Sequence, residues 1–211
     1  MRYGWRSLLV HLTLMSAAFG SAPALAAGKL IWAFGDSLTA GYGLPPSQGF
    51  VPQLQQALNR AGVAATVRNG GIAGDTAAQA RARLLWGLRG LGARPDLVIV
   101  ELGANDMLRG LPVAQAETNL DLILAELERR RLNVLLVGMK APPNLGAAYR
   151  RSFDAIYPAL AKRYRLPLYP FFLDGVAGNR RLIQADGLHP NIRGVAIIVQ
   201  RILPTVRHAL R

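Results

Sequence analysis

The sequence predicts an α/β fold, a three-layer α/β/α sandwich with a five-stranded parallel sheet in its middle layer. Two observations carry this prediction. Apolar segments of strand length alternate along the chain with amphipathic segments of helix length, which is typical of βαβ units. The apolar segments are continuous rather than interrupted at every second residue, which indicates strands covered on both faces. The 211 residues contain no internal repeat, and a chain of this length is expected to form one domain.

Five segments have the length and the apolar content of buried strands. One of them reads Leu-Val-Ile-Val-Glu-Leu and is almost entirely apolar. The predicted strands are Leu30–Phe34, Ala64–Arg68, Leu97–Leu102, Val134–Met139 and Pro167–Phe172. In open parallel sheets ligands bind beyond the carboxyl ends of the strands, so we expect the functional residues in the loops that follow these segments.

Five helices are expected between and after the strands, because apolar residues recur there every three or four positions. Asp75 is a suitable N-cap for the second helix, and Pro204 is expected to kink or end the last one. The predicted helices are Phe50–Ala61, Thr76–Leu88, Val113–Arg130, Ala147–Tyr164 and Ile192–Leu210.

The first 26 residues have the three-part order of a secretory signal. Two arginines open the segment, Leu8–Phe19 is mostly apolar, and small residues lead to Ala24-Leu25-Ala26. An uncleaved membrane anchor is the alternative. It is less favoured because the apolar run is short for a membrane span and is interrupted by polar residues, glycine and proline. We therefore expect a signal peptide at 1–26, a single mature domain at 27–211, and a periplasmic or secreted protein.

The composition excludes several classes of site. The chain has no cysteine, so it contains no disulfide, no thiolate metal site and no cysteine nucleophile. Its formal charge is +13, and loss of Arg2 and Arg6 with the signal leaves +11. The arginines are scattered over separate helices and turns without interleaved aromatic residues, which argues against nucleic-acid binding. We expect a monomer whose basic surface makes at most weak contact with anionic membranes.

Few residues remain as candidates for nucleophilic catalysis. After residue 26 the chain has only three serines and two histidines. Ser37 lies in Gly35-Asp36-Ser37-Leu38, directly after the first predicted strand, where its hydroxyl would reach the carboxyl edge of the sheet. Ser47 has the surroundings of a turn residue, and Ser152 lies inside a predicted helix. Ser37 is therefore the candidate nucleophile, although a serine in this place can also act as a simple helix cap.

His189 is the candidate base. Asp186 precedes it by three residues in a loop before the last predicted helix, so a turn can bring the carboxylate to one ring nitrogen and leave the other for Ser37. His208 has no such partner and lies near a predicted helix C-terminus, where a histidine is favourable for structural reasons.

Two loops offer donors for an oxyanion hole. Asn69–Asp75 follows the second predicted strand, and its glycines allow backbone N–H groups to approach a ligand closely. Gly103-Ala104-Asn105-Asp106 follows the third strand, and Asn105 offers a side-chain amide. Each loop is also an ordinary turn sequence, so the argument depends on their joint occurrence after successive strands.

Four short motifs, in this order, resemble the SGNH hydrolases, also called the GDSL family. The longer stretches GDSLTAGYGL, ELGANDMLRG and APPNLG are similar to the bacterial subgroup of thioesterase I, arylesterase and lysophospholipase. The match extends over nearly the whole mature chain. The four motifs are Gly35–Leu38, Gly74-Asp75, Gly103–Asp106 and Asp186–His189.

The resemblance implies a flavodoxin-like fold and a serine hydrolase that needs neither metal nor organic cofactor. It implies Ser37 as nucleophile, His189 as base and Asp186 as the group that orients the base. The oxyanion hole would consist of the Ser37 and Gly74 N–H groups and the Asn105 side chain. Gly70 and Gly71 stand near Gly74, which is preferred because an aspartate follows it as in the family.

Two loops that follow strands three and four are apolar and are predicted to form a groove for an acyl chain. The predicted acyl-binding residues are Met107, Leu108, Leu111, Pro142 and Pro143. The expected substrates are acyl esters, namely aryl esters, lysophospholipids and acyl thioesters, cleaved through an acyl-enzyme on Ser37. The alternatives are a carbohydrate O-acetyl esterase of the same mechanism and a non-catalytic lipid- or surface-binding protein on the same fold.

Overall fold

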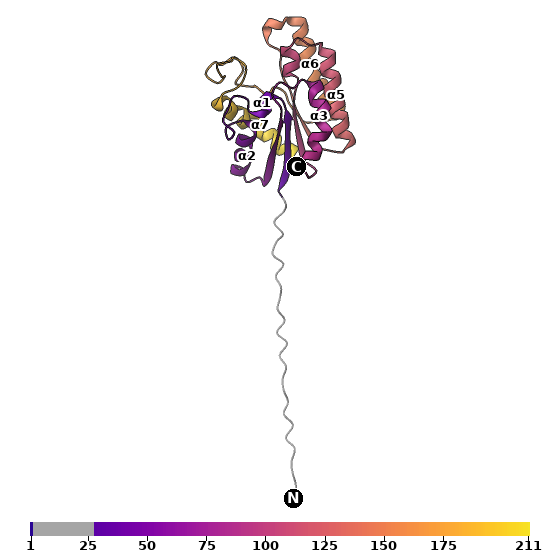
Figure 1. Cartoon of the computed structure of the whole chain (residues 1–211), viewed down its shortest axis with the longest axis vertical. Coiled ribbons are helices and arrows are strands. Elements are labelled where there is room, and N and C mark those ends of the chain that lie inside the picture. Colours follow the sequence, from indigo (N-terminus) through magenta and orange to yellow (C-terminus); the bar gives the residue numbers. More distant parts are fainter. Residues whose placement is uncertain (2–27) are drawn as a thin grey trace.

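The computed structural model describes Met1 and residues 28–211 of the chain (Figure 1). The predicted signal peptide at 1–26 lies outside the described residues, apart from Met1. Within the described part of the chain, no helix has both the length and the apolar content that crossing a membrane requires.

A five-stranded parallel sheet forms the middle layer, as the sequence predicts. The strand order is β2-β1-β3-β4-β5, and every neighbouring pair is parallel. The central strands β1, β3 and β4 are almost entirely buried, which agrees with their continuous apolar sequences. The strands are β1 Lys29–Gly35, β2 Ala65–Gly71, β3 Leu97–Glu101, β4 Val134–Val137 and β5 Leu168–Tyr169.

The fifth strand is shorter than predicted. The sequence suggests a strand over Pro167–Phe172, but β5 contains only Leu168 and Tyr169. Prolines at positions 167 and 170 flank these two residues and have no N–H to donate to a neighbouring strand. A short edge strand is the consequence, although the Phe172 N–H still donates to the Gly138 carbonyl just beyond the end of β4.

Helices cover both faces of the sheet (Figure 1). The helices α2 and α7 pack together on one face, while α3, α5 and α6 pack side by side on the other. Two short helices, α1 and α4, follow β1 and β3 directly and were not predicted. The helices are α1 Ser37–Ala40, α2 Phe50–Arg60, α3 Ala77–Gly90, α4 Ala104–Leu108, α5 Val113–Arg129, α6 Ala147–Tyr164 and α7 Ile192–Ala209.

The predicted helices agree with the structure to within two residues at each end, but Asp75 and Pro204 do not have the roles expected of them. The N-cap of α3 is Thr76 rather than Asp75, because Thr76 and Gln79 exchange hydrogen bonds between side chain and backbone in a capping box. Asp75 is instead paired with Arg83. Pro204 does not end α7, which continues to Ala209. Pro204 lies on the exposed side of the helix, where water can reach the carbonyl that it leaves without a donor.

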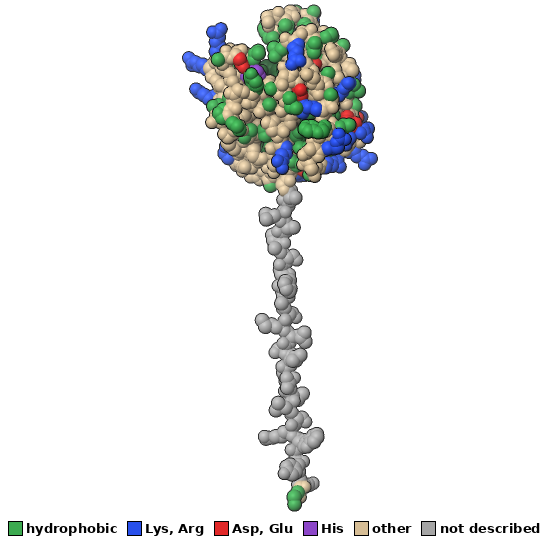
Figure 2. Space-filling view, viewed as in Figure 1, with side chains coloured by type: hydrophobic (Ala, Val, Ile, Leu, Met, Phe, Trp, Pro, Cys, Tyr) green, Lys and Arg blue, Asp and Glu red, His purple; other side chains and the backbone are tan. Residues whose placement is uncertain are grey.

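This architecture brings the loops that carry the predicted functional residues to one edge of the sheet. The loops after β1, β2, β3 and β4 all leave from the carboxyl ends of parallel strands, and the loop before α7 returns to the same edge. Figure 2 shows that Lys and Arg side chains occupy several separate parts of the visible face rather than one patch.

Candidate active site

Ser37 is the first residue of α1 and comes two residues after the end of β1. Asp36 is the N-cap of this helix, and its carboxylate accepts a hydrogen bond from the Leu38 N–H at 3.0 Å. A side chain at Gly35 would collide with Thr39 Oγ1 at 2.2 Å, so only glycine fits there. The backbone N–H of Ser37 is in the first turn of a helix and has no acceptor within it, which leaves this group available to an anion.

A continuous set of hydrogen bonds links Ser37, His189 and Asp186. The distance from Ser37 Oγ to His189 Nε2 is 2.9 Å, and the distance from His189 Nδ1 to Asp186 Oδ2 is 2.6 Å. The second oxygen of Asp186 accepts the Leu188 N–H at 2.9 Å and the His189 N–H at 3.0 Å. These three side chains therefore meet in the order that transfer of a proton from a hydroxyl to an imidazole requires.

Asp186 is held as an anion over the whole neutral range. The hydrogen bond from the Leu188 backbone N–H, followed by those from His189, lowers the pKa of Asp186 to about 2. A carboxylate in this state accepts the Nδ1–H of His189, which fixes the tautomer in which Nε2 is free to accept a proton from Ser37.

The loop that carries His189 is tied to the loop after α1. Gln184 accounts for this contact, because its N–H donates to the His189 carbonyl at 2.8 Å and its side-chain amide donates to the Tyr42 carbonyl at 2.8 Å. The same amide donates to the Pro190 carbonyl at 3.0 Å. The Tyr42 ring lies against the His189 ring, with centroids 4.6 Å apart. Sequence analysis did not identify Gln184 or Tyr42, because no local pattern links residues so far apart in the chain.

The three glycines considered for the oxyanion hole have different surroundings in the structure. A Cβ at Gly70 would lie 2.2 Å from Trp32 Nε1, and one at Gly71 would lie 2.3 Å from the Ala40 nitrogen. Both are therefore glycines because neighbouring groups pack against them. Gly74 has a φ of +85° and lies on the wall of the large groove that contains Ser37. Of the three, Gly74 is the one whose backbone borders that groove.

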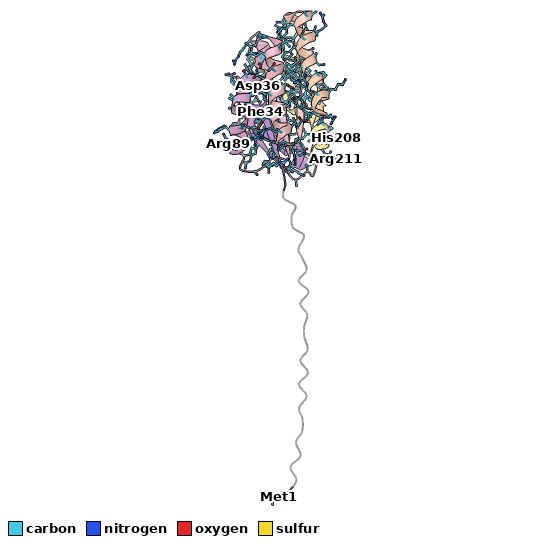
Figure 3. All side chains as sticks on the ribbon, turned by 90° about the vertical axis from the view of Figure 1, so that its right-hand side faces the viewer. Met1, Phe34, Asp36, Arg89, His208 and Arg211 are labelled. Carbon is cyan, nitrogen blue, oxygen red and sulfur yellow. The ribbon has the colours of Figure 1, made fainter. Side chains whose placement is uncertain are left out.

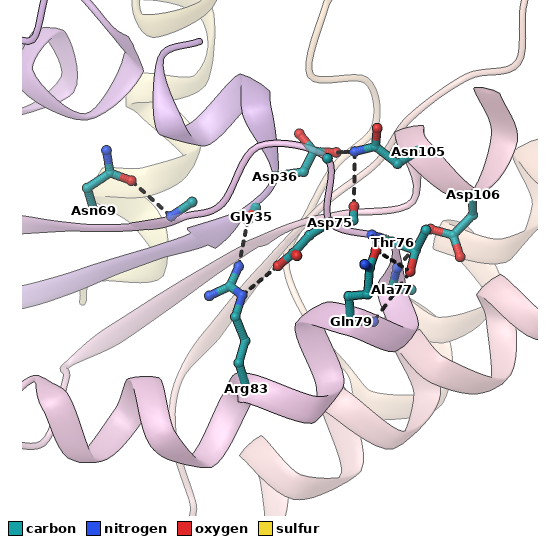
Figure 4. Close-up of polar contacts among 12 residues, drawn as sticks. Gly35, Asp36, Asn69, Asp75, Thr76, Ala77, Gln79, Arg83, Asn105 and Asp106 are labelled. Atoms are coloured by element: carbon teal, nitrogen blue, oxygen red, sulfur yellow. Dashed lines mark hydrogen bonds and ion pairs between the residues drawn. The ribbon is translucent and has the colours of Figure 1, made fainter. Parts of the chain in front are cut away.

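Asn105 lies in α4, next to the nucleophile loop. Its side-chain amide donates to Asp36 Oδ2 at 3.1 Å and to the Asp75 carbonyl at 3.0 Å (Figure 4). Both amide hydrogens are thus directed at acceptors inside the site. An oxyanion formed at Ser37 must share or replace one of these acceptors before it can bind Asn105.

Two buried acids lie beneath the nucleophile and were not identified from the sequence. Burial raises the pKa of Asp36 to about 6 and raises the pKa of Glu101 well above its usual value. The Thr39 hydroxyl donates to Glu101 at 2.8 Å. Nearby, Arg83 donates both to Asp75 and to the carbonyl of Gly35, which ties α3 to the end of β1 (Figure 4).

The remaining serines and histidine lie elsewhere. Ser47 is exposed in a turn, and Ser152 is exposed on α6. His208 lies in the last turn of α7, close to Arg211 and away from Asp36 (Figure 3). Among residues 28–211 no group of three His, Asp or Glu side chains has the arrangement of a metal site.

Ser37 and His189 open into a groove with a volume of about 800 Å³. Most of its lining is apolar, and it includes four of the residues predicted to bind an acyl chain, Met107, Leu108, Pro142 and Pro143. Leu111, predicted with them, does not line the groove. The opposite wall was not predicted, and its main residues are Phe171, Leu173, Ile183 and Leu188. Lys140 and Arg150 also line the groove.

Comparison with known proteins agrees with this geometry. Residues 33–197 match the GDSL-like Lipase/Acylhydrolase family. The chain is 39% identical over 185 residues to Esterase TesA of Pseudomonas aeruginosa, and this match covers 88% of this chain and 91% of that protein. It is 36% identical over 187 residues to Thioesterase 1/protease 1/lysophospholipase L1 of Escherichia coli strain K12, with 87% and 88% covered.

A solved structure gives the same result. The chain is 47% identical in sequence to AlinE4, a SGNH-hydrolase family esterase, and the crystal structure of AlinE4 superposes on it with a TM-score of 0.75. The match covers 89% of this chain and all of that chain (100%). The chain therefore belongs to the GDSL-like lipase/acylhydrolase family, the SGNH hydrolases, and is a serine hydrolase that acts on ester bonds.

Proposed function

We propose that Ser37, His189 and Asp186 are the catalytic triad of this hydrolase. The Ser37 oxygen attacks the carbonyl carbon of the ester while His189 Nε2 takes the hydroxyl proton. His189 then returns this proton to the leaving alcohol, which departs and leaves an acyl group on Ser37. A water molecule, activated by the same imidazole, attacks the acyl-enzyme and releases the carboxylic acid. Asp186 orients the ring and stabilises its protonated form.

The oxyanion hole that we propose consists of the N–H groups of Ser37 and Gly74 and the side chain of Asn105. A separate observation supports each of these groups. The Ser37 N–H lies at the start of a helix, where it has no acceptor, and Gly74 borders the groove. The Asn105 side-chain amide lies beside the loop that carries the nucleophile. Charge on the substrate oxygen would draw one Asn105 hydrogen away from Asp36 or from the Asp75 carbonyl. The amide would then bind more strongly in the transition state than in the ground state.

The observation that carries this proposal is the pair of distances 2.9 Å and 2.6 Å that joins Ser37, His189 and Asp186 at the groove. The groove is large and mostly apolar, so we propose medium-chain and long-chain acyl esters, including lysophospholipids, as substrates. The name of the Escherichia coli relative includes both thioesterase and lysophospholipase. The N-terminal sequence supports a periplasmic or secreted protein, which rarely meets acyl-CoA, so we place thioesters second.

The expected oligomeric state is a monomer, and weak contact with anionic membranes is proposed from the charge of +11 that remains after residue 26. Size-exclusion chromatography and sedimentation with anionic vesicles test these two points directly.

Hydrolysis of p-nitrophenyl esters of increasing acyl length, with Ser37→Ala beside the wild type, tests the proposed function. Serine-dependent activity that extends to medium or long chains supports the acyl esterase. Activity limited to the acetate would favour a carbohydrate O-acetyl esterase instead. If neither protein cleaves any ester in the series, the catalytic proposal is wrong and a binding protein is the better interpretation.

A further inference from the structure

The charged side chains that line the groove are all of one sign. Lys140 and Arg150 lie on its wall, and no aspartate or glutamate does. A groove that binds only hydrocarbon gains nothing from a charged group, because charges are costly to place beside apolar surface. Two cations in the lining of one mostly apolar groove therefore indicate an anionic group on the ligand.

Lys140 follows β4 directly, after Gly138 and Met139. Its ammonium group lies 5.6 Å from the centre of the Phe171 ring, which is also part of the groove wall. This contact holds the charge near the groove without neutralising it. Within residues 28–211, no carboxylate lies within ion-pair distance of Lys140.

Arg150 lies in the first turn of α6, the helix that follows the loop containing Pro142 and Pro143. Its Nε atom is buried and has no hydrogen-bond partner in the described part of the chain. Buried polar atoms in folded proteins nearly always have a partner, so this guanidinium is incompletely paired, and a small shift of the side chain toward the groove would let a ligand acceptor complete its hydrogen bonds.

Lys140 is set apart from the reacting atoms. Ser37 follows β1 and Lys140 follows β4, and β3 lies between these strands. Two strand spacings correspond to roughly 10 Å along the edge of the sheet. A substrate that reaches both Ser37 and Lys140 therefore has its anionic group several bonds away from the ester carbonyl.

We propose that Lys140 and Arg150 form an anion-binding subsite that makes esters with a second, negatively charged group the preferred substrates. A carboxylate or a phosphate has the required chemistry, since both accept hydrogen bonds from ammonium and guanidinium groups. The charged group can lie on the acyl side, at the end of the chain, or on the alcohol side, as in a lysophospholipid. This inference rests on the proposed esterase function and specifies its substrate class.

The test compares two pairs of esters that differ in one anionic group. The first pair is p-nitrophenyl octanoate and the mono-p-nitrophenyl ester of suberic acid, which has a carboxylate at the end of the acyl chain. The second is monooctanoylglycerol and octanoyl lysophosphatidic acid, in which a phosphate lies on the alcohol side. We expect kcat/KM to be about tenfold higher for the charged member of one pair, and which pair shows it identifies the side of the charge.

The same preference is expected to decrease as ionic strength rises, because salt screens the interaction with partly exposed cations. This measurement uses only the wild-type protein. Lys140→Gln and Arg150→Gln are each expected to lower the ratio of charged to neutral kcat/KM about tenfold. The control is Arg207→Gln, which removes the same charge from an exposed residue in the last turn of α7, and is expected to leave the ratio unchanged.

The outcomes separate the two proposals. Hydrolysis of the neutral esters without any preference for the charged ones would overturn the subsite and leave the esterase function intact. An equal loss of preference in Arg207→Gln would assign the effect to overall charge, and the subsite would again be wrong. If the wild type cleaves none of the four esters, the proposed function fails and the subsite fails with it.

Discussion

The two sides of the groove are built differently. The side that carries the reacting groups Ser37 and His189 is held by polar contacts: Asp36 caps α1 and accepts Asn105, Thr39 donates to Glu101, and Asp186 pairs with His189. Glycines on this side are required by close contacts, as at Gly35. The side formed by Met107, Leu108 and groove residues between 139 and 183 contacts the groove mainly through apolar surface, with two cations among it.

This difference suggests a division of work. A hydrogen-bonded network fixes atoms to within a fraction of an ångström, which the reacting groups need. Apolar walls set which substrates fit, and they tolerate exchange of one residue for another more readily. Changes on the first side should therefore reduce catalysis of every ester, whereas changes on the second side should alter the preference among esters.

The largest effect is expected from Ser37→Ala and His189→Ala, because each removes a reacting group. The turnover number should fall by roughly 10⁴-fold or more while the unfolding temperature stays close to that of the wild type. Steady-state hydrolysis of a p-nitrophenyl ester measures this. Ser152→Ala and His208→Ala are matched controls at exposed positions and should retain full activity. Near-normal turnover in Ser37→Ala would end the proposed mechanism.

A smaller loss is expected from Asn105→Ala. Removal of one oxyanion donor typically costs roughly 10²- to 10³-fold in kcat, and the change here also removes the contacts with Asp36 and the Asp75 carbonyl. Single-turnover measurements of the acylation step check the prediction. Asn133→Ala removes an exposed amide that donates to the Asp96 carbonyl, and it should not alter the rate. An unchanged kcat in Asn105→Ala would remove this residue from the oxyanion hole without affecting the role of Ser37.

A third prediction concerns the stability of the polar side. The pKa of Asp36 is about 6 in the folded protein and has an ordinary value of 3.8. Between these values the folded state binds more protons than the unfolded state, so the contribution of Asp36 to the unfolding free energy falls as pH rises from 4 to 6. A pKa difference of about two corresponds to a change of at most about 3 kcal/mol in the unfolding free energy.

Asp36→Asn removes this titration. The unfolding free energy of the variant minus that of the wild type should therefore increase by up to about 3 kcal/mol as pH rises from 4 to 7. Urea unfolding at several pH values measures the change with pH and separates it from the hydrogen bonds that the variant loses at every pH. Glu128→Gln, an exposed change on α5, is the control. If the unfolding free energies of Asp36→Asn and the wild type differ by the same amount at every pH, Asp36 is not the titrating group.

The polar side was also the more predictable from sequence. Ser37, Asp186 and His189 were identified because each lies in a short motif, and two of them are only three residues apart. The order of strands and helices followed from continuous apolar runs and helical periodicity. The helices α1 and α4 were missed, because four or five residues are too few for a periodic pattern.

The groove wall was predicted only in part. Loops next to the motifs supplied Met107 and Pro142, but the roles of Gln184 and Arg150 depend on contacts between distant segments. Gln184 donates to a carbonyl 142 residues earlier in the chain, and no local sequence signal marks such a contact. Leu111 was included because it follows the motif closely in sequence, yet it lies off the groove.

The smallest effect is expected on the apolar side, from Leu108→Ala. Leu108 is about half exposed, at 51%, and lines the groove, so its removal takes away contact with a bound chain but no reacting group. The ratio of kcat/KM for octanoate to that for acetate should fall about tenfold, since loss of a few methylene contacts is worth about 1–3 kcal/mol. Leu122→Ala removes a leucine of similar exposure, 44%, from α5 outside the groove, and should leave the ratio unchanged. Equal losses for both esters in Leu108→Ala would mean that this wall acts on the reacting atoms as well, and the division between the two sides would not hold.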